Sequence, residues 1–138
     1  GCQEGHQGEI VMDFLDKIVD HIETNLELYS PIRVGILGTE NSIAIRPTPG
    51  PLPTGYLNGE RLRGFSFQIL TQHENPHTAY TTLEEITDLL DAMDVAIQGD
   101  RYTMVYSALY TSPQVAEVTP QGYHIYTALF EAELLKEV

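Results

Sequence analysis

The 138-residue chain has one cysteine, no tryptophan and few basic residues. The single cysteine, Cys2, excludes an intramolecular disulfide framework and a cysteine-based zinc cluster. No apolar run approaches the roughly 18–20 residues of a membrane helix, so we expect no membrane partner. Seven Lys and Arg against twenty Asp and Glu leave a net charge of −13. Because so acidic a surface repels phosphate backbones, we also expect no nucleic-acid partner.

The remaining composition is that of a globular protein, with 42% hydrophobic and 20% charged residues. The length fits one domain, which we place at residues 11–138. Residues 1–10 are rich in glycine and lack the basic and apolar regions of a secretory signal. We interpret them as a flexible tail or a cloning remnant, and expect synthesis inside the cell.

Two segments have the apolar spacing of amphipathic helices with acidic outer faces. Residues 11–27 form the first, and Pro31 prevents its continuation. For the second, Thr81 or Thr82 is the expected N-cap, Glu84 and Glu85 occupy the first turn, and Gly99 marks the end.

The other periodic segments predict strands. Residues 32–37 and 42–46 are expected to form a hairpin, and residues 62–73 alternate as a half-buried strand with Phe65, Phe67 and Ile69 on one face. Residues 102–111 and 123–130 complete the set, separated by a turn region at 113–122. The predicted fold is α+β: a two-layer α/β sandwich of order α-β-β-β-α-β-β, with two helices on one face of a mixed, mostly antiparallel five-stranded sheet.

Residues 47–60 contain four prolines and three glycines. Alternating prolines favour an extended polyproline II path, and Asn58-Gly59 is a strong turn signal. We therefore predict a stiff, exposed Pro/Gly arm over 47–60.

The sequence shows no arrangement of residues that is typical of a catalytic site. His73 and His77 have a metal-ligand spacing, but Asn75-Pro76 between them interrupts a helix, so an ordinary loop pair is favoured. No nucleophile motif or phosphate loop is present. We expect no enzyme activity, catalytic residue, metal or cofactor; a small metal-assisted hydrolase using His73 and His77 is the alternative.

Four of the seven basic residues fall between positions 33 and 63, whereas the helices are almost wholly acidic. This distribution fits two complementary surfaces for head-to-tail association, or a set of isolated surface arginines. The late strands are rich in tyrosine, so the sheet face without helices needs a cover. A module that binds a small molecule near Tyr106 and Tyr126 is a further alternative.

Six segments stand out when the chain is viewed as a whole: Met12-Asp-Phe-Leu-Asp16, Arg46-Pro-Thr-Pro-Gly-Pro51, Tyr56-Leu-Asn-Gly59, Phe65-Ser-Phe-Gln-Ile69, His73-Glu-Asn-Pro76 and the helix at residues 83–90. Together they resemble the minor capsid proteins of Gram-positive tailed phages and prophages, a group similar to tail terminator and tail-completion (head-tail joining) proteins. The resemblance covers roughly residues 12–130.

The resemblance implies a structural virion protein at the tail end or head-tail joint, assembled in the bacterial cytoplasm. It implies a homo-oligomeric ring, commonly six-fold, that contacts tail-tube and head-completion proteins. The family motif fixes no functional residues. The interface candidates come from the charge and loop pattern of this sequence, and they are Arg46, Tyr56, Leu57, Arg61 and Arg63.

Overall fold

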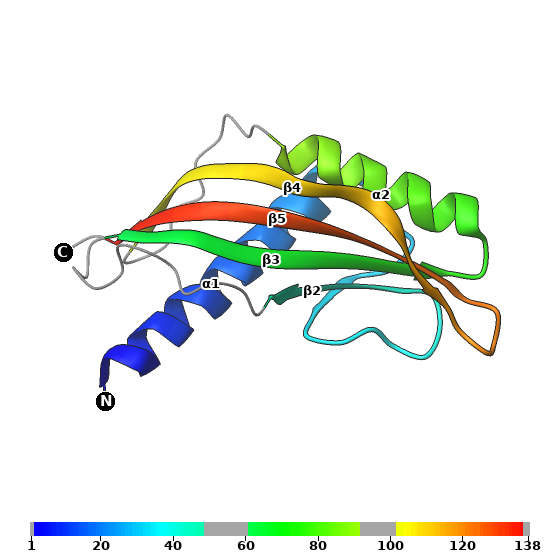
Figure 1. Ribbon diagram of the computed structural model, residues 1–138, viewed down its shortest axis with the longest axis horizontal. Helices are drawn as coiled ribbons and strands as arrows, with labels where there is room; N and C mark the ends of the chain where they lie inside the picture. Colours follow the sequence, from blue (N-terminus) through cyan, green and yellow to red (C-terminus); the bar gives the residue numbers. More distant parts are fainter. Residues whose placement is uncertain (1, 49–60, 92–101, 137–138) are drawn as a thin grey trace.

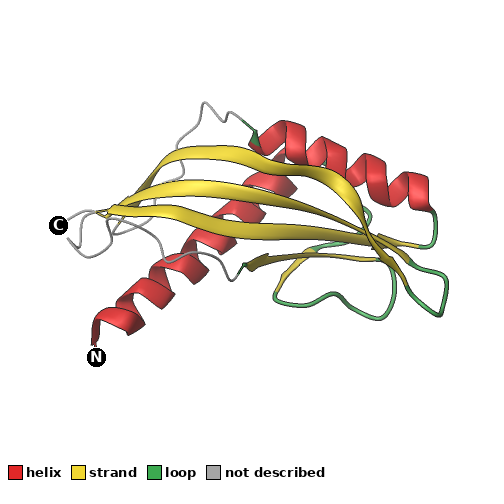
Figure 2. Cartoon of the chain, viewed as in Figure 1, coloured by secondary structure: helices red, strands yellow, loops and turns green. Residues whose placement is uncertain are grey.

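The computed structural model describes the backbone of residues 2–48, 61–91 and 102–136, and side-chain surroundings within 13–48, 66–91 and 111–132. A sheet and two helices form two layers (Figure 1; Figure 2). In chain order the elements are α1 (Cys2–Asn25), β1 (Ile32–Val34), β2 (Ser42–Pro47), β3 (Arg61–His73), α2 (Pro76–Leu90), β4 (Tyr102–Val118) and β5 (His124–Lys136).

The described strands form one sheet of order β1-β2-β3-β5-β4. The β2–β3, β3–β5 and β4–β5 pairs are antiparallel, and the β1–β2 pair is parallel. The predicted α+β class, element order and mixed, mostly antiparallel sheet are therefore confirmed.

Helix α1 begins at Cys2, inside the segment predicted to be a tail, and ends at Asn25. No proline interrupts residues 2–25, so the backbone hydrogen bonds of the helix continue to its first turn. At the other end the Asn25 side-chain amide donates to the His21 carbonyl at 2.8 Å. No helix in the described part of the chain combines the length and apolarity that a membrane span requires.

The prediction of a hairpin at residues 32–46 is wrong, because β1 runs parallel to β2, with Ile32 opposite Ile43. A parallel pair needs a connection that returns to the starting end. Since β1 has only three residues, residues 35–41 are long enough for this return. Gly35 starts the return with a φ of 125°, and its N–H donates to the Ile45 carbonyl at 2.9 Å.

The prediction for the start of the second helix is also wrong. The N-cap of α2 is Asn75, whose side-chain oxygen accepts from the backbone N–H groups of His77 and Thr78. Pro76 occupies the first turn, where its missing N–H costs no helical hydrogen bond. Glu84 therefore lies in mid-helix, and the helix ends at Leu90, before the predicted stop at Gly99.

Strand β4 continues to Val118, through the first half of the predicted turn region. Pro113 is tolerated there because β4 is an edge strand of the described sheet, and its register against β5 shifts between Thr111 and Gln114. The turn occupies residues 119–123, where Gly122 has a φ of 93° and its N–H donates to the Thr119 carbonyl.

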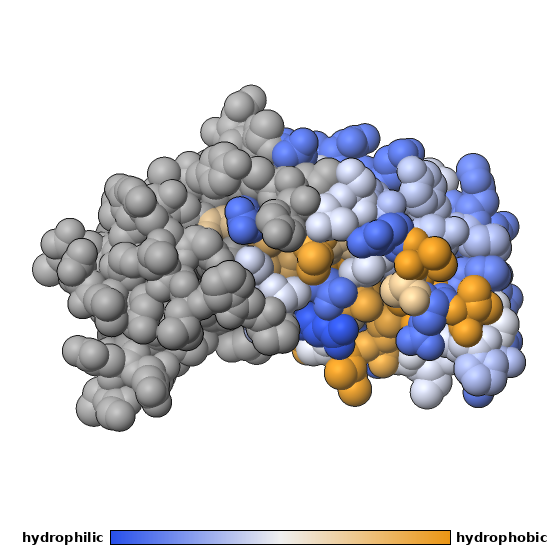
Figure 3. Space-filling model, in the orientation of Figure 1, coloured by the Kyte–Doolittle hydropathy of each residue, from blue (hydrophilic) through white to orange (hydrophobic). Residues whose placement is uncertain are grey.

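Alternation along the strands gives the sheet two different faces. One face packs against both helices, as predicted. We call the other the open face, because neither described helix covers it; it is turned to the viewer in Figure 1. Figure 3 shows apolar side chains gathered on the part of this face nearest the β4–β5 turn, with polar side chains between them.

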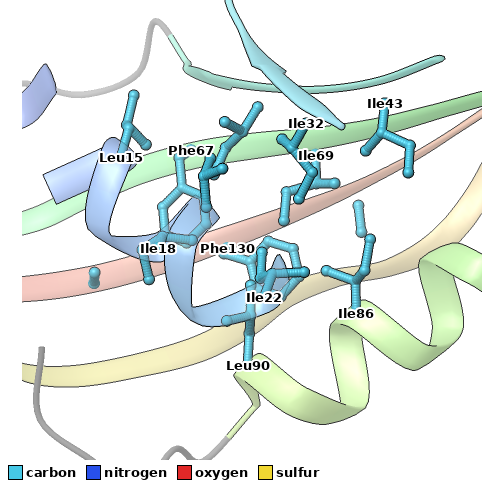
Figure 4. Close-up of a cluster of buried hydrophobic side chains, with 14 of the residues drawn as sticks. Leu15, Ile18, Ile22, Ile32, Ile43, Phe67, Ile69, Ile86, Leu90 and Phe130 are labelled. Atoms are coloured by element: carbon cyan, nitrogen blue, oxygen red, sulfur yellow. The ribbon is translucent and has the colours of Figure 1, made fainter. Parts of the chain in front are cut away.

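The core lies between the sheet and both helices (Figure 4). Phe67 and Phe130, on β3 and β5, stack with ring centroids 5.2 Å apart, and Phe14 from α1 meets Phe67 edge-on at 6.0 Å. Leu83 and Ile86 from α2 are fully buried in the same cluster. The predicted apolar stripe of α1 and the inward face of Phe67 and Ile69 are confirmed. The stripe of the second helix is confirmed for Leu83, Ile86 and Leu90, whereas its predicted continuation at Met93 and Ile97 lies outside the described residues.

Candidate interaction surfaces

The open face carries a string of three hydrogen-bonded polar side chains across three strands. The Arg46 Nε on β2 donates to the Gln68 Oε1 on β3 at 2.9 Å, and the Gln68 Nε2 donates to the Thr127 Oγ1 on β5 at 2.7 Å. Both ends of the Gln68 amide are therefore occupied, which fixes its orientation. Arg46 is exposed, and its Nε makes this hydrogen bond to a described residue.

A second arginine lies on the same face. Arg33 on β1 is opposite Ala44 on β2, and Ala44 alternates with the core residues Ile43 and Ile45. The Arg33 guanidinium rests on Gly38, where an added Cβ would lie 2.9 Å from the Nη1 atom. Glycine at position 38 thus leaves the space that this arginine occupies.

A polar node ties the return segment 35–41 to the sheet. The Gln72 Nε2 donates to the carbonyls of Gly38, at 3.0 Å, and Glu40, and the Gly38 N–H donates to the Ser42 Oγ at 3.1 Å. Ser42 and Gln72 are buried and lie opposite each other on β2 and β3. These bonds satisfy buried polar groups and fix the path of the segment.

Tyr29 completes this node from the connection after α1. Its hydroxyl lies 3.1 Å from the Ser42 carbonyl and 2.9 Å from the Gln72 carbonyl, both of which accept from it. Burial raises the pKa of the Tyr29 phenol well above its usual value. Tyr29 is therefore a neutral phenol in the folded protein.

The two histidines of the H-x₃-H pair have separate structural positions. His73 is the last residue of β3; its Nδ1 accepts from the Asn75 N–H at 2.9 Å, and its ring meets Tyr29 edge-on at 4.8 Å. His77 is exposed in the first turn of α2. The described residues contain no group of three or more His, Cys, Asp or Glu suited to a metal ion. Nothing here supports the hydrolase alternative.

The structure describes only some of the predicted interface residues. Arg46 lies on the open face, as described above. Arg61 and Arg63 belong to the first residues of β3, where the register against β5 shifts between Leu62 and Phe65. Tyr56 and Leu57, with the predicted arm from residue 49 onward, lie outside the described residues.

Sequence reasoning did not identify Gln68, Thr127 or the Tyr29 node. The alternation of residues 62–73 placed Gln68 and Gln72 on the polar side of their strand. Their partners depend on the strand register, which brings together residues up to 59 positions apart. Tyr126, which the small-molecule alternative placed at a ligand site, faces α2 and meets Tyr80 edge-on at 5.6 Å. The side chain of Tyr106 lies outside the described set.

The described outer surface of the helices is acidic. The exposed carboxylates of the described helix side chains are Asp13, Asp16, Asp20, Glu23, Glu84, Glu85 and Asp88. Lys17 is the one Lys or Arg among those helix side chains. The Glu23 Oε2 accepts from the Ile32 N–H at 3.0 Å and so joins α1 to β1.

The chain is a small two-layer α+β protein. The polar features described above lie on the open face of its sheet and on the outer surfaces of its helices. The family model of the bacteriophage tail terminator protein matches residues 15–136. The chain therefore belongs to the bacteriophage tail terminator family. It is a structural tail protein and a component of the virion. No curated protein matches the sequence.

Proposed function

We propose that this protein ends the phage tail by forming a ring that caps the tail tube at the head-tail joint. The observation that carries the proposal is the family match over residues 15–136, nearly the whole chain. The ring is six-fold and contacts tail-tube and head-completion proteins. It forms in the bacterial cytoplasm and acts structurally, without catalysis or a cofactor.

Two features of the structure support an assembly role. The sheet has an open face with preoriented arginine, and the helices present carboxylates on the opposite layer. An exposed arginine on one layer and carboxylates on the other suit head-to-tail contacts between identical subunits, which close into rings when the rotation between neighbours permits. The subunit contacts of this proposal involve Arg46, Arg61 and Arg63, with Tyr56 and Leu57 from the predicted arm.

The proposal is tested by deleting the gene from the phage or prophage that encodes it. Tails should then lack a defined end and fail to join heads, and a plasmid copy should restore infectious particles. The measurement is electron microscopy of lysates together with the plaque titre. Normal virions without the gene would contradict the proposal.

The ring itself is tested with purified protein. Negative-stain microscopy in the presence of isolated tail tubes should show a ring at one tube end, with six-fold class averages. The control is a tail-tube sample without the protein. Binding along the tube wall, or no binding to tubes, would contradict a terminal ring.

A further inference from the structure

We draw no further inference here: the strongest candidate, the exposed apolar surface patch around Val115 and Val118 at the end of β4, carries none because nothing in the described part of the structure shows what covers it.

Discussion

The two faces of the sheet are built from the same strands but carry different side chains. On the helix side, β3 contributes Phe67 and Ile69 to an apolar core shared with both helices. One residue further along, the open side carries Gln68, bonded to Arg46 and Thr127. Alternation along a strand thus places an apolar packing surface and a polar surface on opposite sides of the sheet. The first is completed within the chain, whereas the second leaves Arg46 exposed.

The core side should be far more sensitive to truncation than the open side. Phe67→Ala removes a ring that contacts both Phe14 and Phe130, so we expect a loss of about 3–5 kcal/mol in the free energy of unfolding. Leu129→Ala, on the open face, should cost only about 1 kcal/mol. Urea unfolding followed by circular dichroism measures both. Equal losses would show that the open face is also a core surface.

The Tyr29 node should contribute the next largest effect. Tyr29→Phe removes a hydroxyl bonded to two carbonyls at the ends of β2 and β3, and should cost about 1–2 kcal/mol. Because the folded state raises the pKa of this phenol, the unfolded chain ionises first as the pH rises above about 10. The stability difference between wild type and variant should therefore be complete at neutral pH and shrink at alkaline pH. A difference that grows above pH 10 would contradict the assignment.

The cap that starts α2 should matter less. Asn75→Ala leaves the His77 and Thr78 N–H groups without their side-chain acceptor and should cost about 1 kcal/mol. Asn75→Asp keeps an acceptor oxygen and serves as the matched control, with stability within a few tenths of a kcal/mol of wild type. Thermal unfolding reports both. The opposite ranking would mean that the helix starts elsewhere, as the sequence first suggested at Thr81 or Thr82.

The smallest expected effect has the opposite sign. Asp88→Asn removes a negative charge from the last turn of α2 and should stabilise the isolated subunit by roughly 0.3–1 kcal/mol. Asp16→Asn, in the middle of α1, should leave stability nearly unchanged. Chemical denaturation at low protein concentration measures both. A loss of stability in Asp88→Asn would show that the carboxylate has a structural partner within its own chain.

The sequence was informative wherever periodicity alone decides the structure. The helical spacing of Ile18 and Ile22, and the alternation of Phe67 and Ile69, indicated which side chains enter the core. The predictions failed where a local signal has two meanings. Pro76 was interpreted as a break, yet it begins a helix because Asn75 caps the preceding position. Pro113 suggested a turn, yet an edge strand accepts it at a register shift.

The candidate site was less predictable than the fold. Arg46 was predicted as an interface residue because basic residues cluster around it in the sequence. Its hydrogen-bonded string continues through Gln68 and Thr127, on strands whose pairing no local pattern reveals. The parallel pairing of β1 with β2 was equally hidden, since a short strand with a short connection resembles a hairpin in sequence. Both features depend on contacts between segments far apart in the chain.

By itself, the sequence determined the class of the fold, the order of its elements, the apolar faces of its helices and the acidity of their exteriors. These follow from residue type and spacing, which act over one or two turns or a single strand. The tertiary structure decided the strand order, the direction of β1, the cap of α2 and the polar string across the open face. Each of these depends on register and on which backbone groups are left to be satisfied, and only the assembled sheet sets those.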